Sequence, residues 1–241
     1  MNLPSLFALL LALSLPLTLR ADLTIQEKVE GAGPVSNVTV KIKGDMARIE
    51  ASPQVTSIIN GKTGDMISLM NDQKVAVRMS AQKLKAATEM MKKYNARDSS
   101  QKSDNAVHKL QPTGKKDKIG GYDTEEYVQD SPDLKASFWI ATNYPDAANI
   151  LKQLETLSSE FMKQTAKMPD YRDFPGFPLK TVFTVNGTQV TSTVVSVKTD
   201  SLDASQFTVP ADYHEMQTPD LKDLMGGKGQ EAGGEASPHQ P

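Results

Sequence analysis

The sequence contains no cysteine, and aromatic residues make up only 6% of its 241 positions. Without cysteine the chain can form no disulfide, attach no c-type haem and use no thiol nucleophile. It also offers no cysteine for lipid modification. The 27 lysines and arginines nearly balance the 29 aspartates and glutamates, so charge favours neither nucleic acid nor an anionic membrane as a partner. Stability must therefore come from a hydrophobic core, which a chain of this length can bury.

Catalytic and metal-binding motifs are equally scarce. The sequence has no Gly-x-Ser-x-Gly elbow, no His-Glu-x-x-His zinc helix and no glycine-rich phosphate loop beside a lysine. Its three histidines, His108, His214 and His239, stand far apart in the chain, which is not typical of zinc ligands. We therefore expect a protein that is not an enzyme and that carries no metal or cofactor.

One long apolar run is present, from Leu3 to Leu19, and Arg20 and Ala21 end it. The run is short for a membrane-spanning helix, which needs about 20 apolar residues. Ala21 is the small residue expected before a cleavage point, so residues 1–21 are predicted to be a signal peptide cut before Asp22. The mature protein is then periplasmic or secreted and has no permanent membrane span. Because no lysine or arginine precedes the run, an uncleaved N-terminal anchor is the alternative.

Apolar residues alternate with period two through the first part of the mature chain, as is typical of half-buried strands. Short turns such as Asn60-Gly61 separate the alternating segments and indicate an antiparallel meander. The strands are expected over residues 23–29, 38–42, 46–51, 55–59, 66–70 and 75–79. A helix should follow, with Ser80 as its cap and Leu84 and Ala87 on its apolar side.

The second part of the mature chain mixes strands with one long helix. Residues 95–118 are polar and aperiodic, which predicts a mobile loop. A long amphipathic helix should run between Pro145, placed in its first turn, and Pro169, which ends it. The strands are expected over residues 119–128, 134–140, 179–185, 190–197 and 206–209. Residues 22–216 thus form one domain, and the polar tail 217–241 should be disordered.

Three short sequence motifs follow one another along the chain. Residues 43–50 hold a Gly-Asp turn followed by Arg48, residues 56–63 a hairpin with an Asn-Gly turn, and residues 202–210 the pattern Asp-x-x-x-Phe-x-x-Pro. Together they resemble the lipoprotein-carrier superfamily of Gram-negative envelopes, most closely an uncharacterised branch of secreted bacterial proteins. The chain departs from the carrier itself, because it lacks a helix before the first strand. Arg48 is also not followed by proline, so an arginine latch is not carried over.

The resemblance implies an α+β fold: a strongly curved antiparallel sheet, an open and incomplete β-barrel, with helices across its concave face. In that superfamily the enclosed cavity holds acyl chains. The apolar faces of the predicted strands and long helix supply the candidate lining residues. These are Val40, Ile42, Val77, Met79, Phe138, Ile140, Leu154, Phe161 and Phe183.

The same side chains would serve equally well as ordinary packed core, so their pattern leaves two hypotheses open. In the first, the protein is an envelope binding protein that holds a lipid or an acylated protein in the cavity. In the second, it is a structural or regulatory domain with a fully packed core, whose partner is another envelope protein.

Overall fold

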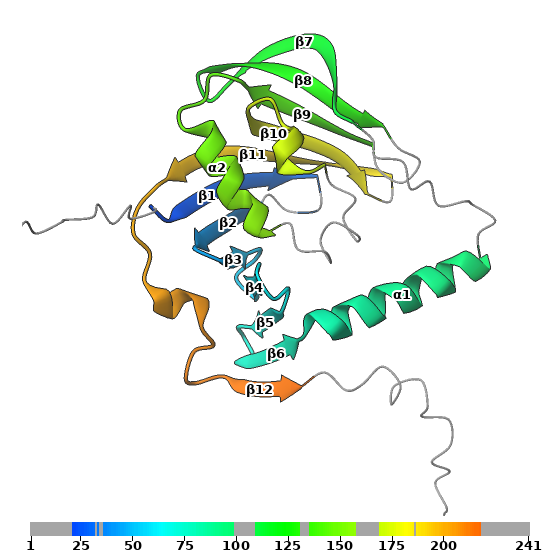
Figure 1. Ribbon diagram of the computed structural model, residues 1–241, viewed down its shortest axis with the longest axis vertical. Helices are drawn as coiled ribbons and strands as arrows, with labels where there is room; N and C mark the ends of the chain where they lie inside the picture. Colours follow the sequence, from blue (N-terminus) through cyan, green and yellow to red (C-terminus); the bar gives the residue numbers. More distant parts are fainter. Residues whose placement is uncertain are drawn as a thin grey trace, which may run out of the picture.

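The computed structural model describes residues 21–31, 33, 36–98, 109–130, 135–157, 169–185 and 187–217. Most of them belong to a single sheet with few helices around it (Figure 1). The strands are β1 Leu23–Glu30, β2 Ser36–Lys43, β3 Met46–Glu50, β4 Val55–Asn60, β5 Met66–Met70, β6 Val75–Met79, β7 Gln111–Ile119, β8 Tyr122–Asp130, β9 Lys135–Ala141, β10 Phe177–Val185, β11 Thr188–Lys198 and β12 His214–Gln217. The α-helices are α1 Ala81–Asp98 and α2 Ala147–Leu154, and the 3-10 turns are η1 Glu155–Leu157, η2 Tyr171–Asp173 and η3 Ala204–Phe207.

The sheet has twelve strands in the order β12-β6-β5-β4-β3-β2-β1-β11-β10-β9-β8-β7. Neighbouring strands are antiparallel, except that β12 pairs with β6 in parallel. The pairing of β1 with β11 joins the N-terminal meander to the second half of the chain. Because β12 and β7 are the two edges, the sheet is not closed. A large, open and mostly antiparallel sheet is therefore confirmed.

Period-two alternation divides the side chains of the sheet between two faces. We call the face that carries the larger core cluster the inner face. There Ile25 of β1 lies in register with Val40 of β2, and both are buried. Helix α2 packs on this face, because its Ile150 and Leu154 belong to the same cluster. The cluster members are Leu23, Ile25, Val40, Ile42, Ala47, Ile59, Ala136, Phe138, Ile140, Ala141, Ile150, Leu151, Leu154, Phe174, Phe177 and Leu179.

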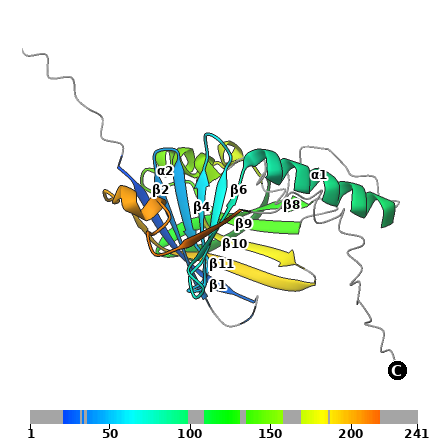
Figure 2. The same ribbon diagram turned by 90° about the horizontal axis from the view of Figure 1, so that it is seen from below.

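The opposite, outer face carries a smaller cluster of Ile58, Leu69 and Ala76 on β4 to β6. Residues 199–217, which we call the C-terminal strap, run along this face and end in the edge strand β12 (Figure 2). Two strap side chains, Val209 and Tyr213, pack against the smaller cluster. The strap thus supplies apolar cover that the outer face of a half-buried meander needs.

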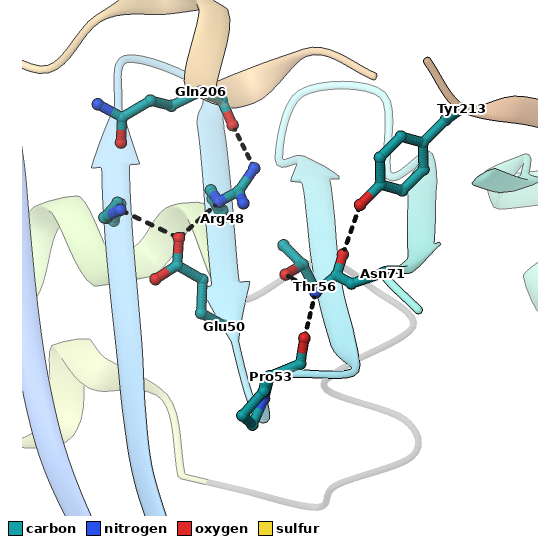
Figure 3. A network of polar contacts seen from close by, with 8 residues as sticks. Arg48, Glu50, Pro53, Thr56, Asn71, Gln206 and Tyr213 are labelled. Atoms are coloured by element: carbon teal, nitrogen blue, oxygen red, sulfur yellow. Dashed lines mark hydrogen bonds and ion pairs between the residues drawn. The ribbon is translucent and has the colours of Figure 1, made fainter. Parts of the chain in front are cut away.

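Polar contacts fix the C-terminal strap to the strands beneath it (Figure 3). Arg48 Nη1 donates to the backbone oxygen of Gln206 at 2.9 Å, and Arg48 Nε donates to Glu50 Oε1 at 2.8 Å. Tyr213 Oη donates to Asn71 Oδ1 at 3.0 Å. Burial raises the pKa of Glu50, but the hydrogen bonds from Arg48 and Lys41 outweigh it, so the net shift is downward. Arg48 therefore acts here as an anchor for the strap.

The predicted helix after β6 is confirmed as α1, and so is its cap. Ser80 Oγ accepts from the backbone N–H of Lys83 at 3.3 Å, and Asp65 Oδ1 accepts from that of Ala81 at 3.0 Å. These two acceptors satisfy backbone donors that the first turn of a helix leaves unpaired. Leu84 is buried as expected.

The prediction of a loop over residues 95–118 is wrong at both ends. Helix α1 continues to Asp98, and β7 begins at Gln111. All side chains from Gln111 to Lys118 are exposed, because β7 is an edge strand that pairs only with β8. A strand with no buried face has no apolar alternation, so the sequence pattern could not reveal it. Residues 99–108 lie outside the described residues.

The end of the domain also differs from the prediction. Residues 206–209 do not form a strand. The 3-10 turn η3 covers Ala204–Phe207, where Asp203 Oδ1 accepts from the backbone N–H of Ser205 at 2.8 Å. The last strand is β12, so Gln217 belongs to the sheet and not to the predicted tail. The rest of that tail, 218–241, and the predicted signal peptide up to Arg20 lie outside the described residues.

The predicted long helix is present as α2 followed by η1, up to Leu157. It begins at Ala147, so Pro145 lies before it and not in its first turn. The reason is Asp146, whose φ of 55° is left-handed and breaks the helical path. Residues 158–168, including Phe161, lie outside the described residues.

Candidate functional site

A cavity of about 180 Å³ lies between the inner face of the sheet and the segments that cover it. Strands β1, β2, β9, β10 and β11 form one side, and α2, η1 and η2 form the other. Most of the lining is apolar. The lining residues are Ile25, Glu27, Val40, Phe138, Leu154, Leu157, Tyr171, Phe174, Phe177, Pro178, Leu179, Lys180, Thr181, Ser192 and Val194.

Aromatic side chains make up one wall of this cavity. Phe138 and Phe174 stack edge to face with their ring centroids 5.2 Å apart, and the rings of Tyr171 and Phe174 are 5.8 Å apart. The turn η2 holds Tyr171 in place, because Asp170 Oδ1 accepts from the backbone N–H of Arg172 at 3.0 Å. The guanidinium of Arg172 also pairs with the Asp170 carboxylate. Local capping chemistry therefore positions the aromatic wall.

Among the described residues that line the cavity, Glu27 is the only carboxylate. It lies on the inner face of β1, in register with Val38 of β2 and Val194 of β11. Its Oε2 accepts a hydrogen bond from Ser192 Oγ at 2.7 Å. Burial raises the pKa of Glu27, and the hydrogen bond from Ser192 offsets part of that rise. Its surroundings thus disfavour a charge on Glu27.

Tyr171 stands close enough to Glu27 to respond to its charge. Burial, and secondly the negative charge of Glu27, raise the pKa of Tyr171 to about 12. The hydroxyl therefore stays protonated at any physiological pH. The cavity thus combines a large apolar surface with a few polar side chains, and the hydrogen bond between Ser192 and Glu27 and the Tyr171 hydroxyl lie among them. Such a site can hold an apolar chain and fix one polar atom, as is usual in small-molecule sites.

The structure brings together three of the predicted lining residues, Val40, Phe138 and Leu154, at this cavity. Ile42 and Ile140 are fully buried in the same cluster, and Phe183 packs at its border. These three do not line the cavity.

Val77 and Met79 lie elsewhere. Register across β5 places them on the inner face, since Ser68 pairs with Val77 and Met66 with Met79. Neither belongs to the larger cluster or to the cavity, because β6 lies far from β10 in the strand order. They therefore do not line the described cavity together with Phe138, whereas the sequence predicts that they do. Phe161 lies outside the described residues.

Sequence reasoning missed Glu27, Tyr171 and Ser192. A signal for Glu27 was present: it interrupts the apolar series Leu23, Ile25 and Val29 at a position where the alternation requires another apolar residue. Tyr171 lies in a loop after Pro169, and only the tertiary fold brings it over the sheet. Ser192 carries no distinguishing pattern in the sequence.

The raised pKa of Glu27 predicts a pH-dependent stability difference. A carboxyl whose pKa is higher in the folded than in the unfolded state does not lower the stability of the fold at pH values below its unfolded pKa. As pH rises through its folded pKa, the group becomes charged and the free energy of unfolding falls. Glu27→Gln should therefore melt above wild type at about pH 8. Below the ordinary value of 4.5 the difference should disappear. Thermal melts across this range are the measurement.

Glu30→Gln is the matched control for this experiment, because Glu30 ends the same strand and pairs with Lys28 at the surface. Tyr171 also lines the cavity, and its pKa, raised to about 12, keeps it protonated throughout this pH range. A gain in melting temperature that is the same at both ends of the pH range would rule out the charge of Glu27 as its cause.

Among the described residues, no group of three histidine, aspartate or glutamate side chains is arranged to hold a metal ion. Over the same part of the chain, no helix is long and apolar enough to cross a membrane.

The sequence matches one known protein family. Residues 22–213 match the family described as Domain of unknown function (DUF4412). No curated protein matches the sequence significantly.

Several solved structures resemble the fold at low similarity. PNGF-II is 17% identical with a TM-score of 0.40, and the match covers 86% of this chain but only 33% of PNGF-II, so the chain spans about a third of that protein. The Mycobacterium tuberculosis lipoprotein LppX is 11% identical with a TM-score of 0.39, covering 76% of this chain and 88% of LppX. MucB, in its complex with MucA(peri), is 10% identical with a TM-score of 0.34, covering 79% of this chain and 55% of MucB. These values are too low to assign a binding partner or an activity.

Proposed function

This chain belongs to the DUF4412 family, and we propose that it is a non-enzymatic binding protein of the bacterial envelope. It holds the apolar chain of a lipid or of an acylated protein in the cavity between the sheet and its covering segments. The predicted signal peptide supports a periplasmic or secreted location. The resemblance of residues 43–50, 56–63 and 202–210 to the lipoprotein-carrier superfamily supports the choice of ligand.

The observation that carries this proposal is the cavity of about 180 Å³ beside Phe138, Leu154 and Phe174. A packed core leaves few voids larger than a water molecule. An apolar void of about 150 Å³, by contrast, can stay dry and accept an apolar molecule. Its position against the inner face of an open sheet agrees with a binding role.

The size of the cavity also favours a second candidate. Sites for drug-sized ligands usually measure about 300–1,000 Å³, so the described cavity accepts only a slender or short apolar group. If nothing binds there, the protein is a structural or regulatory domain whose partner is another envelope protein. The two candidates differ in whether the purified protein takes up an alkyl chain.

Filling the cavity should weaken binding strongly if the proposal is right. Thr181 lines the cavity from β10 and lies in register with Phe138 and Ser192. Thr181→Phe adds an aromatic ring at that point. We expect wild type to bind a fluorescent alkyl probe saturably and Thr181→Phe to bind it at least about ten-fold more weakly, which corresponds to about 1.4 kcal/mol. Fluorescence titration measures both.

Thr184→Phe is the control, because Thr184 lies on the same strand but is exposed. It should bind the probe as wild type does. Melting temperatures of all three proteins establish that each is folded. An absence of saturable binding by wild type would overturn the proposal and favour the interaction domain.

A further inference from the structure

Only one oxygen of the Glu27 carboxyl group is hydrogen-bonded to a described residue. Oε2 has its hydrogen bond from Ser192, whereas no hydrogen bond from any described residue reaches Oε1. Nor does Glu27 take part in a salt bridge with any residue that the structure describes. The nearby Lys28 pairs with Glu30 instead.

The groups that face Glu27 do not neutralise it. Tyr171 on η2 keeps its proton, since its pKa is raised to about 12. Lys180 on β10 also lines the cavity, but its Nζ lies over the ring of Trp139, 5.7 Å from the centroid. The helical side of the cavity supplies the apolar Leu154 and Leu157. Within the part of the chain that the structure describes, Glu27 is thus a hydrogen-bond acceptor that no cation neutralises, at the wall of an apolar cavity.

Such a group sets a requirement on any ligand that fills the cavity. A purely apolar occupant would exclude water from Oε1 and leave it unpaired, which is costly for a carboxylate. An occupant with a donor at one end would replace the lost water by a charge-assisted hydrogen bond. An occupant with a carboxylate at that end would bring two like charges together.

We propose that this cavity selects an amphiphile whose polar end is a hydrogen-bond donor, an ammonium group above all, and that it discriminates against a free fatty-acid carboxylate. This selectivity rests on the proposed function, because it describes the ligand of the same cavity. Glu27 accepts the bond through Oε1, while Ser192 keeps the carboxyl oriented through Oε2. The chain of the ligand lies against Phe138, Phe174 and Leu154.

Three probes of equal chain length test the proposal: decylamine, decanol and decanoate. Each is used as a competitor that displaces a neutral fluorescent alkyl probe from wild type, Glu27→Gln and Glu30→Gln. The titrations are done at about pH 8, where the carboxyl group of free decanoate is ionised and the amino group of free decylamine is protonated. Gln has nearly the same size as Glu, but it carries no charge and has an NH2 donor in place of one acceptor oxygen. Glu30→Gln removes a charge from the same strand at the surface, so it controls for the net charge of the protein. Melting curves establish that each variant is folded.

We expect wild type and Glu30→Gln to bind decylamine at least about ten-fold more tightly than decanoate, as a hydrogen bond to a charged group implies. In Glu27→Gln this preference should fall by about ten-fold while decanol binds as before. Equal binding of the three probes by wild type, or a preference that Glu27→Gln retains, would overturn the selectivity and leave the apolar cavity standing. If wild type binds none of the probes, including the neutral one, the proposed function itself fails.

Discussion

Phe138→Ala should lower the free energy of unfolding by about 3–5 kcal/mol, as is typical when a buried aromatic ring is truncated. Phe138 is 1% exposed, belongs to the larger core cluster and stacks edge to face on Phe174. It therefore joins β9 to the loop that covers the cavity. Denaturant unfolding monitored by circular dichroism gives the value.

Val195→Ala is the matched control, since Val195 also lies in the sheet but is 58% exposed. Its effect should stay within about 0.5 kcal/mol of wild type. A loss of less than about 1 kcal/mol for Phe138→Ala would contradict the packing described for the inner face.

Phe207→Ala, on the outer face of the sheet, should lower the free energy of unfolding by a similar amount. Phe207 is 6% exposed and lies in the C-terminal strap, next to the carbonyl of Gln206 that Arg48 holds. Removing its ring should cost about 3–5 kcal/mol and loosen the strap over Ile58 and Leu69. Denaturant unfolding measures the loss, and binding of an apolar dye reports exposure of the outer face.

His214→Ala is the control for the strap, because His214 is exposed while its backbone still pairs with β6. It should leave both measurements near their wild-type values. If Phe207→Ala binds no more dye than wild type and unfolds with the same free energy, the strap does not protect the outer face.

The strands with one buried face were predictable from sequence, because alternation of residues such as Val40 and Ile42 records the burial directly. Strand β7 was not, since its eight residues up to Lys118 are all exposed and show no apolar alternation. The strand predicted over residues 206–209 failed for a related reason. An apolar pair such as Phe207 and Val209 is equally compatible with a capped 3-10 turn that packs both side chains.

The cavity was predictable only in part. Alternation identified which side chains face inward, and this was enough for Val40, Phe138 and Leu154. It could not identify which inward residues meet, because that depends on the strand order, which brings β1 next to β11. For the same reason Val77 was assigned to a cavity that β6 does not reach. Glu27, the carboxylate of the site, could be found from sequence only as the position where the apolar alternation of β1 is interrupted.

Native mass spectrometry of the protein purified from the cells that make it tests the central claim most directly. We predict that wild type carries an additional mass in the range of a lipid or an acyl-bearing molecule, which organic solvent releases. Thr181→Phe, purified in the same way, should carry none, because its added ring occupies the cavity. Folded wild-type protein without any such mass, under conditions that preserve noncovalent complexes, would contradict the account and leave the inner face as packed core.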